Sequence, residues 1–299
     1  MIKIINLKKT FEKQDVLKGI DIHVQKGKIY GLVGSNGCGK TTVFKHIMGL
    51  YKADEGQILY DNSYIENKDY LNKVYYVQDD LYFPPSYSLD DLYNYEKLLY
   101  TTMSEEKFKN LKKFFKLDGS KKLRTLSKGQ KKQAAFILAI SAMTETLILD
   151  EIVDGLDAVI RKMFWKVLMT EVLDRELTVL ISSHALTELD NICDTVGILH
   201  DGHIVREAEI DQLKEETMRV QFALRSPFVD RPNDDYQIVK TSLIGKVYFV
   251  VIKGDIEAFK QYLHSSFEVL IYEELNMNLE EIFVTELGGL GYGTEDYNI

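Results

Sequence analysis

Short apolar runs and longer amphipathic segments alternate along the chain up to about residue 210. Residues 1–6 alternate into a strand, residues 28–33 form an apolar run, and residues 40–50 have helical periodicity that stops near Gly49. Asp201-Gly202, placed between two apolar runs, predicts a hairpin. The same criteria predict further strands at 57–60, 73–77, 146–150 and 177–182 and further helices at 89–116, 127–142 and 160–173. This alternation indicates an α/β fold.

The pattern changes after about residue 216. Strand-like runs then alternate with two helix-like segments, 256–263 and 279–287, which indicates a small α+β unit joined through residues 211–217. The strands are expected at 219–224, 237–243, 246–252 and 268–272. The glycine-rich end has no periodicity and is predicted to be a loose tail.

Composition narrows the class of protein. The 299 residues are 45% hydrophobic and 28% charged, which is ordinary for a well-cored protein with room for one large and one smaller domain. A net charge of −9 argues against a protein that coats nucleic acid. Two cysteines, Cys38 and Cys193, are too few for a disulfide framework and fit a reducing cytosol. Apolar runs fall short of the roughly 20 residues of a spanning helix, so a role at a membrane is expected to pass through a partner protein.

A glycine-rich segment links the apolar run 28–33 to the helix predicted from residue 40. It matches the phosphate-binding pattern G-x-x-x-x-G-K-[ST] in the strand–loop–helix context that the pattern requires. Glycines let backbone N–H groups and the positive end of the helix approach a polyphosphate. Lys40 is expected to reach the β- and γ-phosphates and Thr41 to ligate Mg²⁺. The segment therefore predicts a nucleoside triphosphate site made by Gly34, Ser35, Asn36, Gly37, Cys38, Gly39, Lys40, Thr41 and Thr42.

Two carboxylates end an apolar strand at 147–151. Asp150, at the carboxyl end of the strand, can hold Mg²⁺ directly or through water beside the phosphate loop. Glu151 can polarise the water that attacks the γ-phosphate. Taken alone, the pair also fits a strand that ends in a solvated acidic turn.

A second anion site is predicted at Leu126-Ser127-Lys128-Gly129-Gln130. This segment offers a serine hydroxyl, a glycine N–H and a helix N-terminus together. A single chain that holds one nucleotide needs only one γ-phosphate site. Two chains arranged head to tail can use both sites of each chain. Ser127, Gly129 and Gln130 of one copy could then close over the triphosphate that Lys40 of the other copy holds.

In this order and spacing, the segments resemble the ATP-binding subunit of an ABC (ATP-binding cassette) transporter over about residues 1–210. Residues 126–130 are similar to the signature motif of that family, and Asp150-Glu151 to the end of its Walker B strand. The resemblance assigns Gln78 to the Q-loop, Asp157 to the D-loop and His184 to the switch histidine. Phe11 corresponds to the aromatic residue that stacks on adenine. Taken singly, Gln78 could be a solvated amide, His184 a helix cap and Phe11 a packing residue.

The resemblance implies roles for these residues. Lys40, Glu151 and His184 would be catalytic, and Thr41, Gln78 and Asp150 would hold Mg²⁺. ATP would be contacted by the phosphate loop, Phe11, Gln78 and Asp157, and across a dimer by Ser127, Gly129 and Gln130. The departures Ser35, Lys128 and Ile152 remove no group that the chemistry requires, so an active ATPase is expected.

The resemblance also implies a fold and partners. It implies a P-loop NTPase of the ABC ATPase type, with a RecA-like core, an antiparallel β subdomain and an α-helical subdomain at about 79–143. The ATP-binding domain would span 1–216, a small α+β domain 217–288 and a flexible tail 289–299. The small α+β domain, ending near residues 279–283, is similar to the C-terminal domain of bacterial ABC-2 exporter ATPases, which indicates export of a drug, peptide, lipid or ion.

The expected partners are a transmembrane permease and a second ATP-binding subunit, identical or related, with no nucleic acid. The protein would then be cytoplasmic and peripheral on the inner face of the cell membrane. An aromatic-rich segment at 82–95 fits either contact with a permease or packing within the helical subdomain. The alternative function is a soluble ABC ATPase that acts on ribosomes or DNA. A P-loop kinase or GTPase would leave residues 126–130 unexplained.

Overall fold

The computed structural model describes residues 1–65, 68–184, 186–231 and 234–288. Contacts divide the chain into two compact units, Met1–Glu207 and the part from Ala208 onward. The predicted domain boundary at 216/217 lies further along the chain and stays a prediction. The predicted tail at 289–299 lies outside the described residues. Within those residues, every helix is too short or too polar to cross a bilayer.

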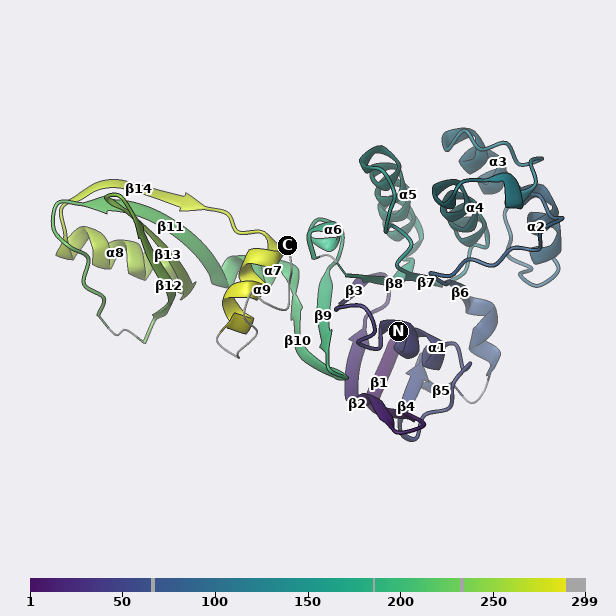
Figure 1. Ribbon diagram of the computed structural model, residues 1–299, viewed down its shortest axis with the longest axis horizontal. Coiled ribbons are helices and arrows are strands. Elements are labelled where there is room, and N and C mark those ends of the chain that lie inside the picture. Colours follow the sequence, from purple (N-terminus) through teal and green to yellow (C-terminus); the bar gives the residue numbers. More distant parts are fainter. Residues whose placement is uncertain (66–67, 185, 232–233, 289–299) are drawn as a thin grey trace. The chain divides into compact units, whose positions relative to one another are not determined.

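A six-stranded sheet forms the centre of the first unit, in the order β10-β9-β3-β8-β7-β6 (Figure 1). The neighbours β9-β3-β8-β7-β6 run parallel, and every residue of β3, β7 and β8 is buried. Parallel strands with helices on their faces require such continuous burial. Asp201 and Gly202 at the β9–β10 turn both have positive φ, as the predicted hairpin requires. The strands are β3 (Ile29–Val33), β6 (Val74–Val77), β7 (Thr146–Asp150), β8 (Thr178–Ser183), β9 (Thr195–His200) and β10 (His203–Glu209).

An antiparallel four-stranded sheet, in the order β2-β1-β4-β5, makes a second layer of this unit. Its strands are β1 (Ile2–Phe11), β2 (Gln14–Val24), β4 (Glu55–Tyr60) and β5 (Ser63–Tyr64). Helix α1 (Lys40–Ile47) packs between the two sheets, because Val43, Phe44 and Ile47 share one core with Ile4 of β1 and Leu180 of β8. The start of α1, where the phosphate loop ends, is thereby held between two sheets.

Helices α2 (Leu89–Glu96), α3 (Glu105–Phe114) and α4 (Lys128–Ser141) form the helical part of the unit (Figure 1). Aromatic rings hold it together: Tyr93 stacks on Phe108 at 4.1 Å, and Phe136 of α4 stacks at 4.2 Å on Phe164. Phe164 belongs to α5 (Ala158–Arg175), so this second stack joins α4 to α5. Short helical turns η1 (Lys68–Lys73), η2 (Leu123–Thr125) and α6 (Leu186–Leu189) complete the unit.

The single helix predicted at 89–116 is wrong, since two helices occupy this range. The chain turns between them, where the Thr102 hydroxyl donates to the Ala142 carbonyl at 2.6 Å and the Ser104 N–H donates to the Ser141 carbonyl at 2.8 Å. Ser104 then caps α3 by accepting the Lys107 N–H. Hydrogen bonds to the end of α4 therefore interrupt a pattern that is helical on both sides.

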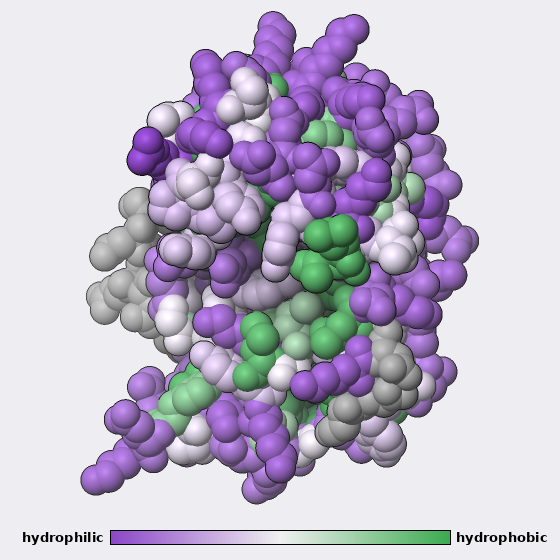
Figure 2. All heavy atoms as spheres, turned by 90° about the vertical axis from the view of Figure 1, so that its right-hand side faces the viewer, coloured by the Kyte–Doolittle hydropathy of each residue, from purple (hydrophilic) through white to green (hydrophobic). Residues whose placement is uncertain are grey.

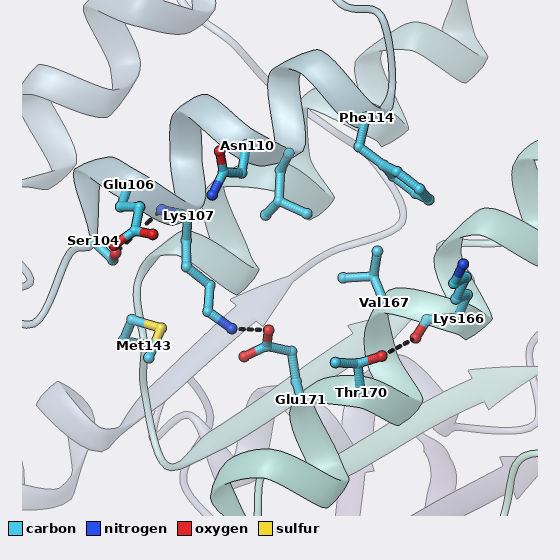
Figure 3. Close-up of a pocket in the computed structure, with 11 residues that line it drawn as sticks. Ser104, Glu106, Lys107, Asn110, Phe114, Met143, Lys166, Val167, Thr170 and Glu171 are labelled. Atoms are coloured by element: carbon cyan, nitrogen blue, oxygen red, sulfur yellow. Dashed lines mark hydrogen bonds and ion pairs between the residues drawn. The ribbon is translucent and has the colours of Figure 1, made fainter.

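A cavity of about 490 Å³ lies between α3 and α5 (Figure 3). Leu111 and Phe114 line it from α3, and Val167 and Thr170 from α5. At one side, the Lys107 ammonium of α3 pairs with the buried Glu171 carboxylate of α5. This ion pair and the aromatic stack of α4 both link the helical part to α5.

The second unit is an antiparallel sheet in the order β12-β13-β11-β14 with helix α8 on one face. Phe259 and Leu263 of α8 pack on Val220, Phe222 and Val250 of the sheet. The joining segment forms a helix, α7, which buries Ile210 and Leu213 and is therefore more than a plain linker. Its elements are α7 (Ile210–Glu216), β11 (Thr217–Leu224), β12 (Tyr236–Ile244), β13 (Val247–Gly254), α8 (Ile256–Ser266), β14 (Val269–Leu275) and α9 (Leu279–Gly288).

Candidate nucleotide-binding site

The phosphate loop runs from the end of β3 to the first residue of α1 and leaves no room for a side chain at Gly34. A Cβ on Gly34 would lie 2.3 Å from the Leu199 carbonyl oxygen. Gly37 and Gly39 have φ of 82° and 116°, in the region that favours glycine. The loop therefore has the close-wrapped backbone that the sequence pattern predicts, with the N-terminus of α1 at its end.

Lys40 folds back over this loop. Its ammonium donates to the carbonyl oxygens of Gly34 at 2.6 Å and Ser35 at 3.2 Å, and it pairs with Glu151 Oε1 at 3.1 Å. The Lys40 side chain is only 4% exposed. The carboxylate predicted to act on water and the lysine predicted to bind the γ-phosphate are thus brought into direct contact.

Glu151 sits directly after β7 in a left-handed conformation, with φ of 47°. Its N–H donates to the Ser182 hydroxyl at 3.0 Å. Burial raises the pKa of the Glu151 carboxyl, but the hydrogen bond and charge of Lys40 outweigh burial and leave that pKa below its ordinary value. Glu151 is therefore ionised at neutral pH and can accept a hydrogen bond or a proton from a water molecule.

Asp150 is fully buried at the end of β7. One of its oxygens accepts the Ser182 hydroxyl at 2.6 Å, and the other accepts the Tyr76 hydroxyl at 3.2 Å. Burial and the neighbouring Asp150 charge raise the pKa of Tyr76, so this phenol stays a donor. The Asp150 carboxylate is held in one orientation by partners from β8 and β6.

Thr41 and Gln78, the other two predicted Mg²⁺ ligands, are both exposed. Thr41 is the second residue of α1, and Gln78 directly follows β6, the strand next to β7. A hydroxyl, an amide and a carboxylate are all oxygen donors, which Mg²⁺ prefers. The donor chemistry therefore fits Mg²⁺, and the assignment stays a prediction.

Sequence reasoning missed Asp154, which lies in the turn between β7 and α5. Its Oδ2 is 2.9 Å from His184 Nδ1, and ligand atoms of Glu151, Asp154 and His184 all lie within 4.8 Å of one another. Burial raises the pKa of the Asp154 carboxyl to about 6; His184 opposes the rise and the Glu151 carboxylate adds to it. The only signal in the sequence was a third acid close behind Asp150-Glu151.

A buried lysine, also missed, supports this turn. The Lys132 ammonium of α4 donates to the carbonyl oxygens of Glu151 at 2.6 Å and Asp154 at 2.9 Å, and its side chain is 2% exposed. Asp79, next to Gln78, approaches it at 4.0 Å. Lys132 lies in the polar start of α4, next to Lys131 and before the apolar stretch that begins at Ala134, so the sequence did not distinguish it from an exposed lysine.

Ser127, Gly129 and Gln130 lie at the start of α4. The Ser127 hydroxyl caps the helix by accepting the Gln130 N–H at 3.2 Å. In turn, the Oε1 atom of Gln130 accepts the Ser127 N–H at 3.1 Å. This is the N-cap that the sequence predicts, in the form of a capping box. Asp157 caps α5 in the same way, accepting from Val159 and Ile160. Ser127, Gln130 and Asp157 thus have a local structural role beside their predicted contact with ATP.

Three further predicted residues lie at the edges of the site. Phe11, at the end of β1, packs edge-on against Tyr51 at 5.2 Å, with the Lys9 ammonium 5.3 Å from its ring. Cys38 is half-buried, and burial raises the pKa of its thiol. Thr42 uses its carbonyl oxygen to accept His46 Nδ1–H at 2.7 Å. The roles of Phe11, Cys38 and Thr42 toward ATP stay predictions.

The chain is similar to a family sequence model, to several known proteins and to solved structures. The sequence model of the family described as ABC transporter matches residues 17–154. The ABC transporter ATP-binding protein YtrB of Bacillus subtilis is 32% identical over 97% of this chain and 99% of its own length. The bacitracin transport ATP-binding protein BcrA of Bacillus licheniformis is 28% identical over 97% and 98%. The fold is also similar to the dimeric structure of a bacterial ABC transporter cassette, MJ0796. The match covers 70% of this chain and 99% of that chain, with a TM-score of 0.64 and 21% sequence identity.

Proposed function

The chain belongs to the ABC transporter family, as an ATP-binding subunit that hydrolyses ATP to drive transport, and we propose that it powers export of a peptide antibiotic or similar compound through a separate permease. The single observation that carries the export proposal is the match over nearly its whole length, second unit included, to a protein named for bacitracin transport. Subunits of this family pair with each other and with permeases.

The proposed hydrolytic step uses residues that already lie in contact. Lys40 is proposed to leave the Gly34 and Ser35 carbonyls and bind the γ-phosphate, because a phosphate offers it more negative charge than two carbonyls do. That movement releases Glu151 from its ion pair with Lys40 to orient the attacking water. His184 is proposed to contact the transferred phosphoryl group. Mg²⁺, held by Thr41, Gln78 and Asp150, would neutralise charge on the phosphates.

The second anion site is proposed to act on the ATP of a partner copy. Ser127 and Gln130 are exposed at the start of α4, so they can meet a triphosphate presented from outside the chain. The basic side chains of Lys128 and Lys131 add positive charge there. ATP would then bridge two copies, and its hydrolysis would let them separate, which is a ligand-driven shift between closed and open states.

A permease is proposed to bind the helical part of the first unit. Leu89, Leu92 and Tyr93 of the aromatic-rich segment are buried, so that portion serves the core. Tyr82 and Tyr95 are 77% and 52% exposed. Just beyond α2, Leu98 and Leu99 are 79% and 57% exposed. Figure 2 shows a largely hydrophilic face with a group of apolar side chains near its centre, and apolar surface of this kind is expected where another protein binds.

The proposed location is the cytoplasmic face of the cell membrane, where such a permease would hold the chain. We further propose that the ATP-binding domain spans 1–216, with its helical subdomain at about 79–143, and that 217–288 forms a separate small domain. The alternative, an ABC ATPase that works on ribosomes or DNA without a permease, finds no support in the net charge of −9.

Two experiments test this proposal. The tagged full-length chain, recovered from gently solubilised membranes of its native cell, should bring down a multi-spanning membrane protein, and recovery with ribosomes or DNA instead would overturn it. Deleting the gene should lower the inhibitory concentration of bacitracin or a lantibiotic. A matched strain carrying Glu151→Gln should be as sensitive as the deletion. Unchanged sensitivity to both compounds in both strains would contradict the proposed substrate class.

A further inference from the structure

A carboxylate that no predicted role uses lies inside the catalytic cluster. Asp154 Oδ2 contacts His184 Nδ1 at 2.9 Å, while Asp154 Oδ1 is buried and has no hydrogen-bond partner among the described residues. The Asp154 side chain is 15% exposed, whereas the imidazole of His184 is 51% exposed. Asp154 is therefore the enclosed partner of the pair and His184 the solvent-facing one.

The backbone of Asp154 is held from two directions. Its N–H donates to the Glu151 carbonyl at 3.2 Å, which closes the turn after β7. Its own carbonyl accepts the Lys132 ammonium of α4 at 2.9 Å, and Lys132 also holds the Glu151 carbonyl at 2.6 Å. A side chain on a backbone restrained in this way can orient a more mobile neighbour.

We propose that Asp154 is a positioning residue for hydrolysis, which fixes a proton on His184 Nδ1 and turns His184 Nε2 toward the γ-phosphate. This inference rests on the roles proposed above for His184 and Glu151. A carboxylate that accepts one ring N–H of a histidine sets both the tautomer and the ring orientation. Without Asp154, the half-exposed ring could rotate and present either nitrogen.

Asp154 is mostly ionised at neutral pH, although burial and the neighbouring Glu151 and Glu188 carboxylates raise its pKa; His184 opposes the rise. Burial raises its pKa to about 6, so it loses its proton as the pH rises past that value and accepts a charge-assisted bond from His184 above it. Below about pH 6 the protonated carboxyl holds His184 less firmly, and hydrolysis is expected to fall. The titratable or charged groups that face it come from its own turn, α4, the end of β8 and α6: Glu151, Lys132, His184 and Glu188.

The same three side chains also have the donor atoms of a metal site. Lys40 already supplies a positive charge to Glu151 at 3.1 Å, and a cation placed among the three would have to compete with it. The His184–Asp154 contact needs no added ion. The geometry therefore favours a hydrogen-bonded pair over a metal centre.

The test compares Asp154→Ala with Asp154→Asn in the full-length chain. The asparagine amide oxygen can still accept from Nδ1 but cannot titrate. We expect Asp154→Ala to lower kcat for ATP by roughly 10–100-fold with little change in KM, as loss of a supporting hydrogen bond does elsewhere. Asp154→Asn should keep kcat within about threefold of the wild type at pH 8 and lose the fall in rate near pH 6.

Imidazole ¹⁵N spectra give a readout that a merely structural role would not move. The His184 signal, assigned by its loss in His184→Gln, should report a proton on Nδ1 in the wild type and in Asp154→Asn. In Asp154→Ala it should shift toward the Nε2–H tautomer. An unchanged His184 signal and unchanged kcat in Asp154→Ala would overturn the inference, as would an Asp154→Asn variant as impaired as Asp154→Ala.

Glu151→Gln separates this inference from the proposed function. If Glu151→Gln abolishes hydrolysis while Asp154→Ala does not affect His184 or kcat, only the positioning role fails. If Glu151→Gln hydrolyses ATP like the wild type, the proposed catalytic mechanism itself fails. Thermal unfolding and ATP binding of each variant identify any loss of fold, and in that case the Asp154→Asn pH profile carries the test.

Discussion

Lys40 and Glu151 compensate each other's charge inside the site. Each is largely buried, and their 3.1 Å contact places a cation where the γ-phosphate is predicted to bind. Removing a partner from a buried pair costs more than the pair itself contributes, because the remaining charge stays desolvated. Bound ATP can replace Glu151 as the partner of Lys40, so nucleotide binding and release of the carboxylate proposed to act on water are one event in this arrangement.

Glu151→Gln should therefore leave ATP binding intact and lower kcat by roughly 10²–10⁴-fold, since an amide cannot accept a proton from water. The affinity for ATP, measured with a fluorescent analogue, is expected to stay within about threefold of the wild type. The substitution removes a carboxylate that competes with phosphate for Lys40, and it removes no group that binds phosphate. A Gln variant that keeps a tenth or more of wild-type kcat would show that Glu151 is not the group that acts on water.

Cys38 gives a second prediction at this scale. Burial raises the pKa of its thiol, so little thiolate exists at pH 7, and alkylation by iodoacetamide should be slow and faster at higher pH. Once formed, the adduct should block ATP hydrolysis by crowding the phosphate loop, and bound ATP should protect.

The matched control is Cys193→Ala, which should be inactivated at the wild-type rate because the Cys193 side chain is buried and poorly accessible to the reagent. Inactivation that proceeds at the same rate with saturating ATP would contradict the placement of Cys38 beside the phosphates.

Residues whose function depends on a fixed local pattern could be predicted from the sequence, and those that act through long-range contacts could not. Lys40 and Ser127 belong to segments whose spacing alone defines a turn or a cap. Lys132 and Asp154 are 22 residues apart and meet only because α4 packs beside the turn after β7. Nothing in the local sequence fixes that approach.

At the scale of elements, α3 and α5 are linked by one buried ion pair beside the cavity in Figure 3. Glu171 is 4% exposed and also accepts Arg175 Nε at 2.7 Å, so two cations compensate one buried carboxylate. Lys107 is the one that comes from the helical part. The pair therefore resists separation of α3 from α5.

Lys107→Met should lower the free energy of unfolding by about 1–3 kcal/mol, because Glu171 loses one of its two cations while methionine keeps the apolar stem. Chemical denaturation followed by circular dichroism measures this. Lys109→Met is the matched control: Lys109 pairs with Glu105 on the exposed face of the same helix, and its loss should leave the midpoint unchanged. Equal effects of the two substitutions would mean that the buried pair does not join the helices.

Element predictions succeeded where one period dominates a segment. The strand at 146–150 matches β7 at both ends, and α4 begins after its predicted cap. Strand β2 was missed, since half of its positions are polar and only pairing with β1 defines it. The segment at 89–116 was predicted as one helix because the interrupting bonds come from the end of α4, far along the chain.

At the scale of the whole molecule, function is proposed to need two copies. Within one chain, the start of α4 carries the predicted anion site of Ser127, Gly129 and Gln130, which the phosphate loop of the same chain does not need. Each composite site would combine Lys40 of one copy with Gly129 of the other. Gly129 can be changed without strain, because an added Cβ would lie 3.6 Å from Leu156, an ordinary contact.

The most direct test of this central claim is the ATPase rate of a mixture of two inactive variants. Lys40→Ala removes the phosphate ligand, and Gly129→Glu places a negative charge at the second anion site, with Gly129→Ala as its matched control. In a mixed dimer, one of the two composite sites combines the intact Lys40 of the Gly129→Glu copy with the intact Gly129 of the Lys40→Ala copy. Mixing equal amounts should therefore restore roughly a quarter of the wild-type rate, the share expected from random pairing. A rate no higher than the sum of the two separate variants would contradict an active site shared between two copies of this chain.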